Sequence, residues 1–399
     1  MTRTFLTSES VTEGHPDKVA DRISDAVLDA LIRQDRRAHV ACETFLTTGL
    51  VLVGGEISTE VYVDIDRVAR GVLEKVGYNK AAYGFNHTDC AVLSAIKEQS
   101  SDIAAAVGQI EENPTGFAPE TYDAVGAGDQ GIMYGYACTS TDQLMPLPIA
   151  LAHQLSMRLA KVRKEHTLPY LRPDGKTQVT VEYDNSRPLR LDTVLIAAQH
   201  DPEIGRETLE KDIAEHVINP TVDKWMDEKT TALVNSSGRF VIGGPASDTG
   251  ITGRKIIVDT YGGYGSHGGG AFSGKDPTKV DRSGSYMARY VAKNVVAAGL
   301  AREVEIQIAY AIGRAAPLAI NVDTYGTGTV ADDVLHRAIE EVFDFRPAAI
   351  IDRFDLLRPI YEQFSCYGHF GRTDPAPNWE KTDAIEDLRR AVPGGAKLP

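Results

Sequence analysis

The spacing of apolar residues divides most of the chain into amphipathic helices and short strands. From residue 16 to residue 34 the apolar side chains recur at helical spacing, and Pro16 suits a first helical position, which needs no amide donor. Two runs of strand-like composition follow, joined by Thr47-Thr48-Gly49, a stretch typical of a hairpin turn. Another amphipathic helix stops at Gly77. In order, the pattern predicts helix, strand, strand and helix over residues 16–34, 39–45, 50–58 and 65–76.

The same order of elements occurs twice more along the chain. A proline opens each set, at positions 16, 146 and 277, so the spacing is 130 and then 131 residues. An internal period of this kind indicates repeated structural units. We therefore expect an α/β (α+β) fold of three α-β-β-α units, each with helices covering one face of its sheet. The second set is predicted over 146–164, 178–183, 190–199 and 207–218, and the third over 277–298, 304–312, 317–324 and 331–343.

Two segments lie outside this pattern. Residues 100–125 are rich in small and acidic side chains, and so long a segment without periodicity is typical of a functional lid or of disorder. The last residues, AVPGGAKLP, predict a frayed tail.

Three glycine-rich windows resemble nucleotide-binding templates without matching them. GAGDQG at 126–131 and GYGSHG at 263–268 have the glycine spacing of a dinucleotide-binding turn. The first is followed by strand-like sequence instead of a helix; the second follows a predicted strand, Lys255–Thr260, but leads into further glycines. GGAFSGKD at 269–276 differs from a P-loop, because Asp276 stands where Ser or Thr would bind Mg²⁺. The windows therefore predict neither a dinucleotide fold nor a Walker A loop.

The last of these glycine runs is still suited to binding phosphate through its backbone amides. Residues 262–274 allow a close approach to a ligand, and Asp276-Pro277 predicts the cap and first position of the next helix. Lys275 lies beside this helix start and Lys279 in its first turn, where cations are unfavourable unless an anion binds. A flexible linker with solvated lysines is the alternative.

A similar cluster precedes the first predicted helix. His15, Asp17 and Lys18 gather at a positive helix end, where an anion or a metal-bridged phosphate would bind. Capping support from Asp17 and an ordinary turn position for His15 are the alternatives. Further cations stand in glycine-rich turns, namely Lys176, Arg239, Arg254 and Lys255.

The composition of the chain excludes some kinds of ligand for such a site. Asp and Glu (56) outnumber Lys and Arg (42), which gives a net charge of −14. A chain this acidic, without a basic run, is a poor candidate for nucleic acid or an anionic membrane surface, so the cations predict a local polyphosphate pocket. The four cysteines stand apart, no apolar stretch reaches membrane-helix length, and the first residues lack the apolar region of a signal peptide. We therefore expect a cytoplasmic protein.

Five motifs resemble those of the S-adenosylmethionine synthetase (methionine adenosyltransferase) family, bacterial type, and the likeness runs from about residue 3 to 385. They are GHPDK (14–18), GAGDQG (126–131), GRF (238–240), TGRKIIVDTYGG (252–263) and HGGGAFSGKDPTKVDRS (267–283).

The resemblance implies three similar subdomains about a pseudo-threefold axis. It also implies a homotetramer, built as a dimer of dimers with active sites between subunits. The boundaries that it implies are subdomains at 3–101, 124–241 and 242–385, a mobile gating loop at 102–123 and a tail at 386–399.

The reaction implied by the resemblance converts ATP, L-methionine and water to S-adenosylmethionine, phosphate and diphosphate. The methionine sulfur attacks C5′ of ATP and expels triphosphate, which is then hydrolysed. A thioether sulfur has no proton to lose, so the chemistry needs alignment and a stabilised leaving group rather than a general base.

The resemblance also assigns roles to single residues. Catalytic roles fall to His15, Asp129, Lys176, Arg254 and Lys275, and ATP contacts to His15, Asp174, Gly175, Lys176, Arg239, Phe240, Asp248, Arg254, Lys255, Ala271 and Lys275. Methionine contacts fall to Glu56, Gln99, Asp248 and Lys279. Implied cofactors are two Mg²⁺ ions per subunit, bound by Asp17 and Asp281, and one K⁺ bound by Glu43. Ser247 and Ile251 depart from the family's usual glycine and leucine, which bears on how Asp248 is aimed.

Two other functions would use the same pocket. One is an ATP-dependent phosphotransferase, for which ADP would accumulate without a sulfonium product. The other is an inactive nucleotide-binding paralogue, against which the presence of every expected site residue argues.

Overall fold

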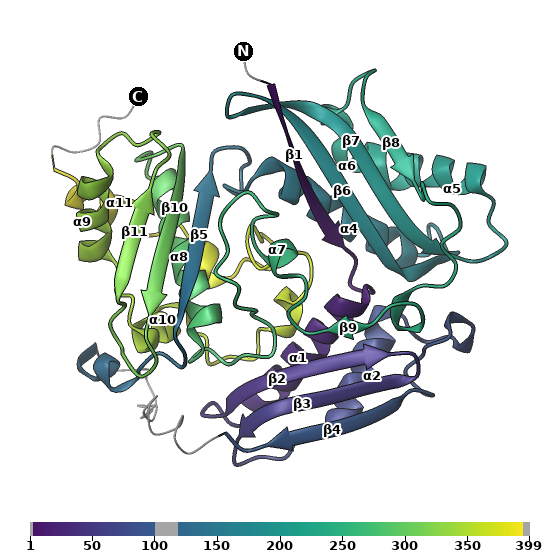
Figure 1. Cartoon of the computed structure of the whole chain (residues 1–399), viewed down its shortest axis with the longest axis horizontal. Coiled ribbons are helices and arrows are strands. Elements are labelled where there is room, and N and C mark those ends of the chain that lie inside the picture. The colour runs from purple at the N-terminus through teal and green to yellow at the C-terminus, as the bar shows by residue number, and fades with distance from the viewer. Residues whose placement is uncertain (1–2, 100–118, 394–399) are drawn as a thin grey trace.

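The computed structural model describes residues 3–99 and 119–393 of the 399-residue chain. Three sheets, each backed by helices, surround the centre of the molecule, and the short helix α7 (Ile256–Asp259) with its flanking loops lies between them (Figure 1). This confirms the mixed α and β class predicted from the sequence. The predicted order of helix, strand, strand and helix is present in all three units.

The first unit shows why the periodicity was informative. Apolar residues of its first helix, such as Val19 and Ile23, are fully buried against inward-facing Val51 and Val53 of the sheet. Its second helix ends at Gly77, whose φ of 108° places it in the left-handed region that favours glycine. The elements are α1 (Pro16–Ile32), β2 (His39–Thr47), β3 (Leu50–Ser58), α2 (Ile65–Val76) and β4 (Ala91–Lys97).

The second and third units repeat this arrangement with longer strands or additional helices. The second contains α4 (Leu147–Lys164), β6 (Leu171–Asp184), β7 (Arg187–His200), α5 (Arg206–Ile213), α6 (Asn219–Val222) and β8 (Thr231–Val234). The third contains α8 (Val280–Ala297), β10 (Glu303–Tyr310), β11 (Ala319–Asp323), α9 (Asp332–Val342), α10 (Pro347–Phe354) and α11 (Ile385–Ala391). Short turns of other helix types are η1 (Ala81–Tyr83), η2 (Pro119–Ala124), the π-helix η3 (Ala214–Ile218), η4 (Asp223–Trp225), η5 (Gly244–Ala246), η6 (Glu362–Phe364) and η7 (Asn378–Glu380).

Each sheet also takes a strand from outside its own unit. β1 (Arg3–Val11) precedes the first unit but pairs with β6, in the order β1-β6-β7-β8. β5 (Gly131–Cys138) pairs with β10, in the order β11-β10-β5, and β9 (Gly250–Ile251) completes the order β4-β3-β2-β9. The sheets are thus interlocked by segments distant in sequence, and the predicted boundaries of the subdomains stay a prediction.

Two local expectations differ from the structure. The predicted strand Lys255–Thr260 is wrong: its centre is the helical turn α7, which places the Asp259 carboxylate on the buried Lys18 ammonium. Pro277 does not open the third unit's helix, because the Asp276 carboxylate accepts hydrogen bonds from the amide (2.9 Å) and hydroxyl (2.6 Å) of Thr278. That turn delays the start of α8 to Val280.

The two segments predicted to lie outside the repeated units are the gating loop and the C-terminal tail. Residues 102–118 of the predicted gating loop lie outside the described residues, whereas 119–124 form η2. The tail predicted over 386–399 differs from the structure in its first part, since α11 extends to Ala391 and both Leu388 and Val392 are buried in the core. Within the described ranges, no helix has the length and apolar character needed to cross a membrane.

Candidate active site

The start of α1 forms the centre of the site. His15 is the N-cap residue, and its Nδ1 accepts a hydrogen bond from the amide of Asp17 at 3.2 Å. Burial, together with the positive charges of Lys255 and Lys176, lowers the pKa of His15 to about 3. The imidazole is therefore neutral near pH 7, and because Nδ1 is an acceptor its proton lies on Nε2. His15 can donate a hydrogen bond to an anion there without carrying charge.

Asp174-Gly175-Lys176, expected from the sequence to be a turn, is part of strand β6 and is joined to this helix start by the exchanged strand β1. Val11, the last residue of β1, is the register partner of Lys176, and the Thr12 amide donates to the Gly175 carbonyl at 2.9 Å. Gly14 packs so closely that a Cβ there would lie 2.2 Å from the Pro173 carbonyl oxygen. Two motifs far apart in sequence are thereby brought into contact.

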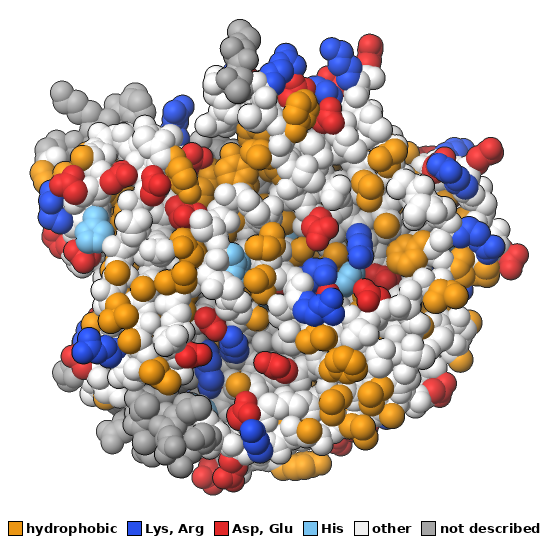
Figure 2. All heavy atoms as spheres, in the orientation of Figure 1, with side chains coloured by type: hydrophobic (Ala, Val, Ile, Leu, Met, Phe, Trp, Pro, Cys, Tyr) orange, Lys and Arg blue, Asp and Glu red, His pale blue; other side chains and the backbone are white. Residues whose placement is uncertain are grey.

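A cationic loop, residues 251–255, lies against the same end of α1. The Ile251 amide donates to Oδ1 of Asp17 at 3.1 Å, and Nζ of Lys255 donates to Oδ2 at 2.5 Å. Burial alone would raise the pKa of Asp17, but Lys255 outweighs it and the pKa is lowered. Arg254 is half-exposed, with Nε 3.9 Å from Oδ1 of Asp17. Figure 2 shows cationic and acidic side chains gathered with a histidine where β1, β6 and β9 meet in Figure 1.

Another cationic loop, the glycine run that ends at Lys275, lies along β2. Lys275 forms a β-bridge with Ala41, and the Cys42 amide donates to the Gly274 carbonyl at 2.8 Å. Nζ of Lys275 donates to Oδ2 of Asp281 at 2.6 Å. This loop touches the 251–255 loop, because a Cβ on Gly253 would lie 2.6 Å from that of Ala271. The Gly128 amide donates to the Thr278 carbonyl at 3.2 Å, which brings GAGDQG and the exposed Asp129 beside it.

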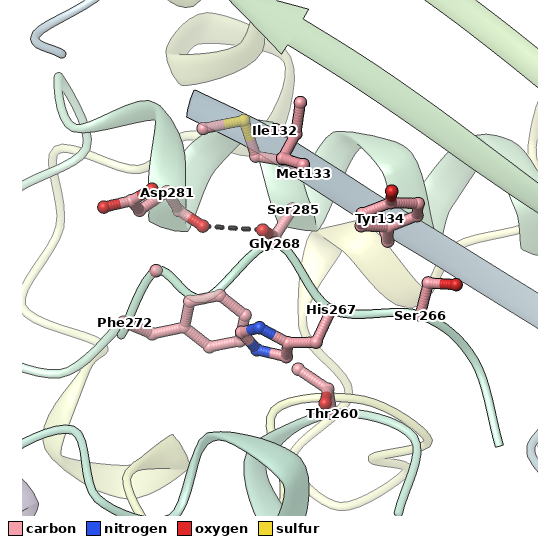
Figure 3. A pocket seen from close by; sticks show the side chains of 11 residues that line it. Ile132, Met133, Tyr134, Thr260, Ser266, His267, Gly268, Phe272, Asp281 and Ser285 are labelled. Atoms are coloured by element: carbon pink, nitrogen blue, oxygen red, sulfur yellow. Dashed lines mark hydrogen bonds between the residues drawn. The ribbon is translucent and has the colours of Figure 1, made fainter. Parts of the chain in front are cut away.

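Asp281 also borders a small pocket between β5 and the glycine run, whose other lining residues include Met133, His267 and Phe272 (Figure 3). Gly270 is required at this border, since a Cβ there would lie 2.2 Å from Oδ1 of Asp281. The Ser285 hydroxyl donates to the Asp281 carbonyl at 2.6 Å (Figure 3).

The predicted adenosine residues sit on a loop tied to Asp174. Oδ2 of Asp174 accepts the Gly244 amide at 2.8 Å, and the Asp248 amide donates to the Gly244 carbonyl at 3.0 Å. Phe240 is half-buried next to Gly243, whereas Arg239 is exposed and donates to the Pro202 carbonyl at 3.1 Å. Burial raises the pKa of Asp174 to about 6, and its Oδ1 is buried without a partner among the described residues. An unpaired oxygen is suited to accepting from a ligand hydroxyl.

The remaining predicted residues are Glu56, Gln99 and Lys279 for methionine and Glu43 for potassium. Glu56 pairs with Lys97 at 3.3 Å, and the Gln99 amide donates to the Ser58 hydroxyl at 3.1 Å, both at one end of the first sheet. Lys279 is held by Asp276 at 2.5 Å. Glu43 is exposed on β2. Within the described part of the chain, none of the four pairs directly with His15 or Asp17.

Asp17 and Asp281 have the donor chemistry that Mg²⁺ requires. No group of three or more His, Cys, Asp or Glu side chains converges in the ranges that the structure describes. Mg²⁺ nevertheless binds through one or two carboxylates together with substrate phosphates, so an isolated carboxylate beside a phosphate site fits it. Asp17 accepts the ammonium of Lys255, and Asp281 accepts that of Lys275.

Models of three protein-family domains match this chain in sequence order. They are the N-terminal domain of S-adenosylmethionine synthetase over residues 3–101, its central domain over 124–240 and its C-terminal domain over 242–381. The chain belongs to the S-adenosylmethionine synthetase family. A full set of the family's domains indicates methionine adenosyltransferase activity, that is, synthesis of S-adenosylmethionine. Neither the phosphotransferase nor the inactive paralogue is favoured.

The synthetase also contains buried polar residues that the motifs did not single out. Asp21, Asp25 and Arg282 are fully buried beside the two cationic loops, and Lys18 is buried rather than facing a ligand. A sequence signal existed, because aspartates recur at 17, 21, 25 and 29, every fourth residue of a predicted helix. The backbone amides that they bind could not be read from the sequence, since these lie more than 200 residues away.

Proposed function

We propose that the cluster around His15 binds the triphosphate chain of ATP and stabilises it as it leaves C5′. The observation that carries this proposal is the neutral, buried His15 at a helix start between Lys176 and Lys255. A helix N-terminus and fixed cations favour an anion there, and Nε2–H of His15 donates a hydrogen bond to the departing oxygen. No general base is needed, because the attacking sulfur carries no proton.

We assign each residue a part of the ATP molecule according to its position in the site. Lys176, Arg254 and Lys255 contact the phosphates from the α1 side, and Lys275 contacts them from the glycine run. Asp174, with its unpartnered Oδ1, accepts from the ribose, and Phe240 packs on the adenine ring. Gly175, Arg239, Asp248 and Ala271 complete the nucleotide site, and Asp129 acts beside Asp281. Cations that extend from a fixed backbone need little reorganisation as charge develops.

Methionine is assigned to Glu56, Gln99, Asp248 and Lys279. The Glu56 carboxylate provides the opposite charge to the methionine ammonium, and Lys279 provides that to its carboxylate. Two Mg²⁺ ions, held by Asp17 and Asp281, would neutralise negative charge on the phosphate oxygens, and Glu43 would bind K⁺.

An apolar row on the outer face of the first sheet supports an active site shared between subunits. On the outer face of the first sheet, Phe45, Leu52 and Leu93 form one cross-strand row, in which Phe45 is 36% and Leu93 54% exposed. Glu43 lies two residues before Phe45 and faces the same side. An apolar sheet face of this kind is typical of a buried interface, so we infer a homo-oligomer, namely a dimer of dimers. All four cysteines are buried and free, which suits the cytoplasm.

One assay tests the reaction and separates it from the alternatives. The protein is incubated with ATP, L-methionine, Mg²⁺ and K⁺, and the products are resolved by mass spectrometry. S-adenosylmethionine with equal amounts of phosphate and diphosphate is the expected outcome. ADP without a sulfonium product would indicate phosphotransfer, and unchanged ATP would indicate an inactive binding protein.

A further inference from the structure

Four aspartates are spaced by four residues along α1, at positions 17, 21, 25 and 29, and all four are buried. Asp21 and Asp25 have no exposed surface. A row of buried carboxylates on one helix face is unfavourable unless each carboxylate finds donors. The donors that they find therefore indicate what the row does.

Asp21 holds the loop that carries Arg254. Its Oδ1 accepts the Gly253 amide at 2.8 Å, and Gly253 directly precedes Arg254 in the chain. Its Oδ2 accepts from the fully buried ammonium of Lys18 at 2.8 Å. The bond to Gly253 fixes the backbone from which the Arg254 side chain extends.

Asp25 holds the loop that carries Lys275 in the same way. Its Oδ1 accepts the Gly274 amide at 2.8 Å, and Gly274 directly precedes Lys275. Arg282 donates to both Asp25 oxygens, at 2.7 and 3.0 Å, and also to the Lys275 carbonyl at 3.1 Å. The pair Asp25–Arg282 therefore holds the backbone on both sides of the Lys275 Cα atom.

The glycines leave these loops no room to shift toward β2 or toward each other. Gly274 has φ +80°, and a Cβ there would lie 1.8 Å from the Cys42 carbonyl oxygen. Gly253 also has φ +80°, and a Cβ there would lie 2.6 Å from that of Ala271. Each loop is thus packed on one side and held by a carboxylate on the other.

We propose that Asp21 and Asp25 are positioning residues for the reaction, acting through Arg254 and Lys275 respectively. This inference rests on the proposed function, in which those two cations contact the leaving triphosphate. Arg282 pairs with Asp25, and Lys18 lies between Asp21 and Asp259, so a buried cation adjoins each of the two carboxylates that hold the loops. Accurate placement matters, because a displacement of about 1 Å can cost about 100-fold in rate.

Asp29 provides a matched control within the same row. Asp29 lies on the same face of α1 and is also buried. It accepts hydrogen bonds from the backbone amides of Tyr361 and Glu362, at 2.9 Å each. That segment carries no residue assigned to the site. An asparagine at 25 places its amide NH2 against Nη2 of Arg282 or against the Gly274 amide, and one at 29 places it against one of the two backbone amides.

The experiment compares Asp25→Asn with Asp29→Asn in the full-length enzyme. For each, the melting temperature, kcat, and KM for ATP and methionine are measured. We expect the two variants to lose similar amounts of melting temperature. For Asp25→Asn, kcat should be about 100-fold lower than in the wild type, and KM for methionine should stay within about twofold of the wild-type value. For Asp29→Asn, kcat should stay within about threefold of the wild-type value. Equal kcat losses for the two variants would overturn the inference.

A double variant shows whether Asp25 acts through Lys275. In a Lys275→Ala background, Asp25→Asn should add little further loss of kcat, because its effect passes through the missing side chain. A full additional loss in the double variant would contradict this route. Should Asp25→Asn fail to fold, Asp21→Asn with Arg254→Ala gives the same comparison, and wild-type kcat in Asp21→Asn would overturn the inference.

Two outcomes distinguish the proposed function from the positioning role. Wild-type kcat in Lys275→Ala would refute the proposed role of Lys275 in expelling triphosphate. An inactive Lys275→Ala enzyme together with a fully active Asp25→Asn enzyme would refute the positioning role alone.

Discussion

Nζ of Lys275 lies 2.6 Å from Oδ2 of Asp281, so the phosphate-binding lysine and one of the two metal-binding carboxylates of the proposal form an ion pair. Both side chains are partly exposed, at 26% and 20%. Such a pair contributes little to stability, and both groups remain able to turn toward a ligand. The site thus combines fixed backbone with charged side chains that can exchange partners.

Replacing Lys275 by alanine should separate activity from stability. We expect Lys275→Ala to lower kcat by about 100-fold or more, as removal of a fixed donor to a developing anion does. Its melting temperature should fall by only a few degrees, because the side chain buries little apolar surface. Lys161→Ala, which removes a lysine from an exposed pair with Glu165 on α4, is the control. Equal losses of activity and melting temperature in Lys275→Ala would contradict the prediction.

Replacing Asp17 by asparagine should weaken the dependence on Mg²⁺. The variant keeps an oxygen to accept the Ile251 amide but loses the charge that attracts a divalent cation. The Mg²⁺ concentration giving half-maximal activity should rise about tenfold, whereas Asp66→Asn, at an exposed pair with Arg70, should leave it unchanged. A Mg²⁺ titration that coincides with that of the wild type would count against Asp17 as a ligand.

The pKa of His15 makes a prediction about stability in acid. Because the folded-state pKa is about 3, below the usual 6.5, the unfolded chain binds one proton more than the native protein between these values. The stability linked to His15 is present above pH 6.5 and is lost as the pH falls. Between pH 8 and pH 5 the wild type should lose about 2 kcal/mol more than His15→Asn in the free energy of unfolding.

Urea denaturation at several pH values measures this difference. Asparagine retains a side-chain oxygen for the N-cap, so the comparison isolates the ionisable ring. Parallel pH profiles for the two proteins would show that the ring titrates normally when folded.

Asp174 makes the opposite prediction. Its folded-state pKa of about 6 lies above the usual 3.8, so the native protein binds the extra proton and this contribution to stability falls as the pH rises. From pH 5 to pH 8, Asp174→Asn should gain about 1.4 kcal/mol relative to wild type in the free energy of unfolding, while binding ATP more weakly. Urea denaturation measures the change in stability, and ATP titration by calorimetry measures the change in ATP binding. A variant that loses stability relative to wild type over this range would refute the pH effect.

A charge on the outer face of the first sheet should disturb assembly. Phe45→Arg places an unpaired cation in the apolar row, and burying it in an interface is unfavourable. Sedimentation velocity should show a smaller species, and activity should fall with it if the active site is shared. Tyr62→Arg, at a position 84% exposed and outside the row, should sediment as the wild type does. Unchanged sedimentation of Phe45→Arg would contradict an interface at this face.

The elements that the sequence predicts well depend on interactions between residues close together in the chain. The helix at 65–76 was predicted to the residue, because amphipathic spacing and a terminal glycine are properties of neighbouring residues. The hairpin of β2 and β3 and the three-unit period were predicted for the same reason. The family motifs then assigned the site residues, although their roles stay predictions.

Tertiary structure decided how those parts meet. The exchange of β1, β5 and β9 between sheets depends on pairings across more than 100 residues, as between Leu46 and Gly250, which no local pattern encodes. The same holds for α7, where the local preference for a strand yields to the contact between Asp259 and Lys18. The sequence by itself determined which elements and charges this enzyme has. Only long-range burial, which forces each hidden carboxylate to find a distant amide or cation, determined where they act.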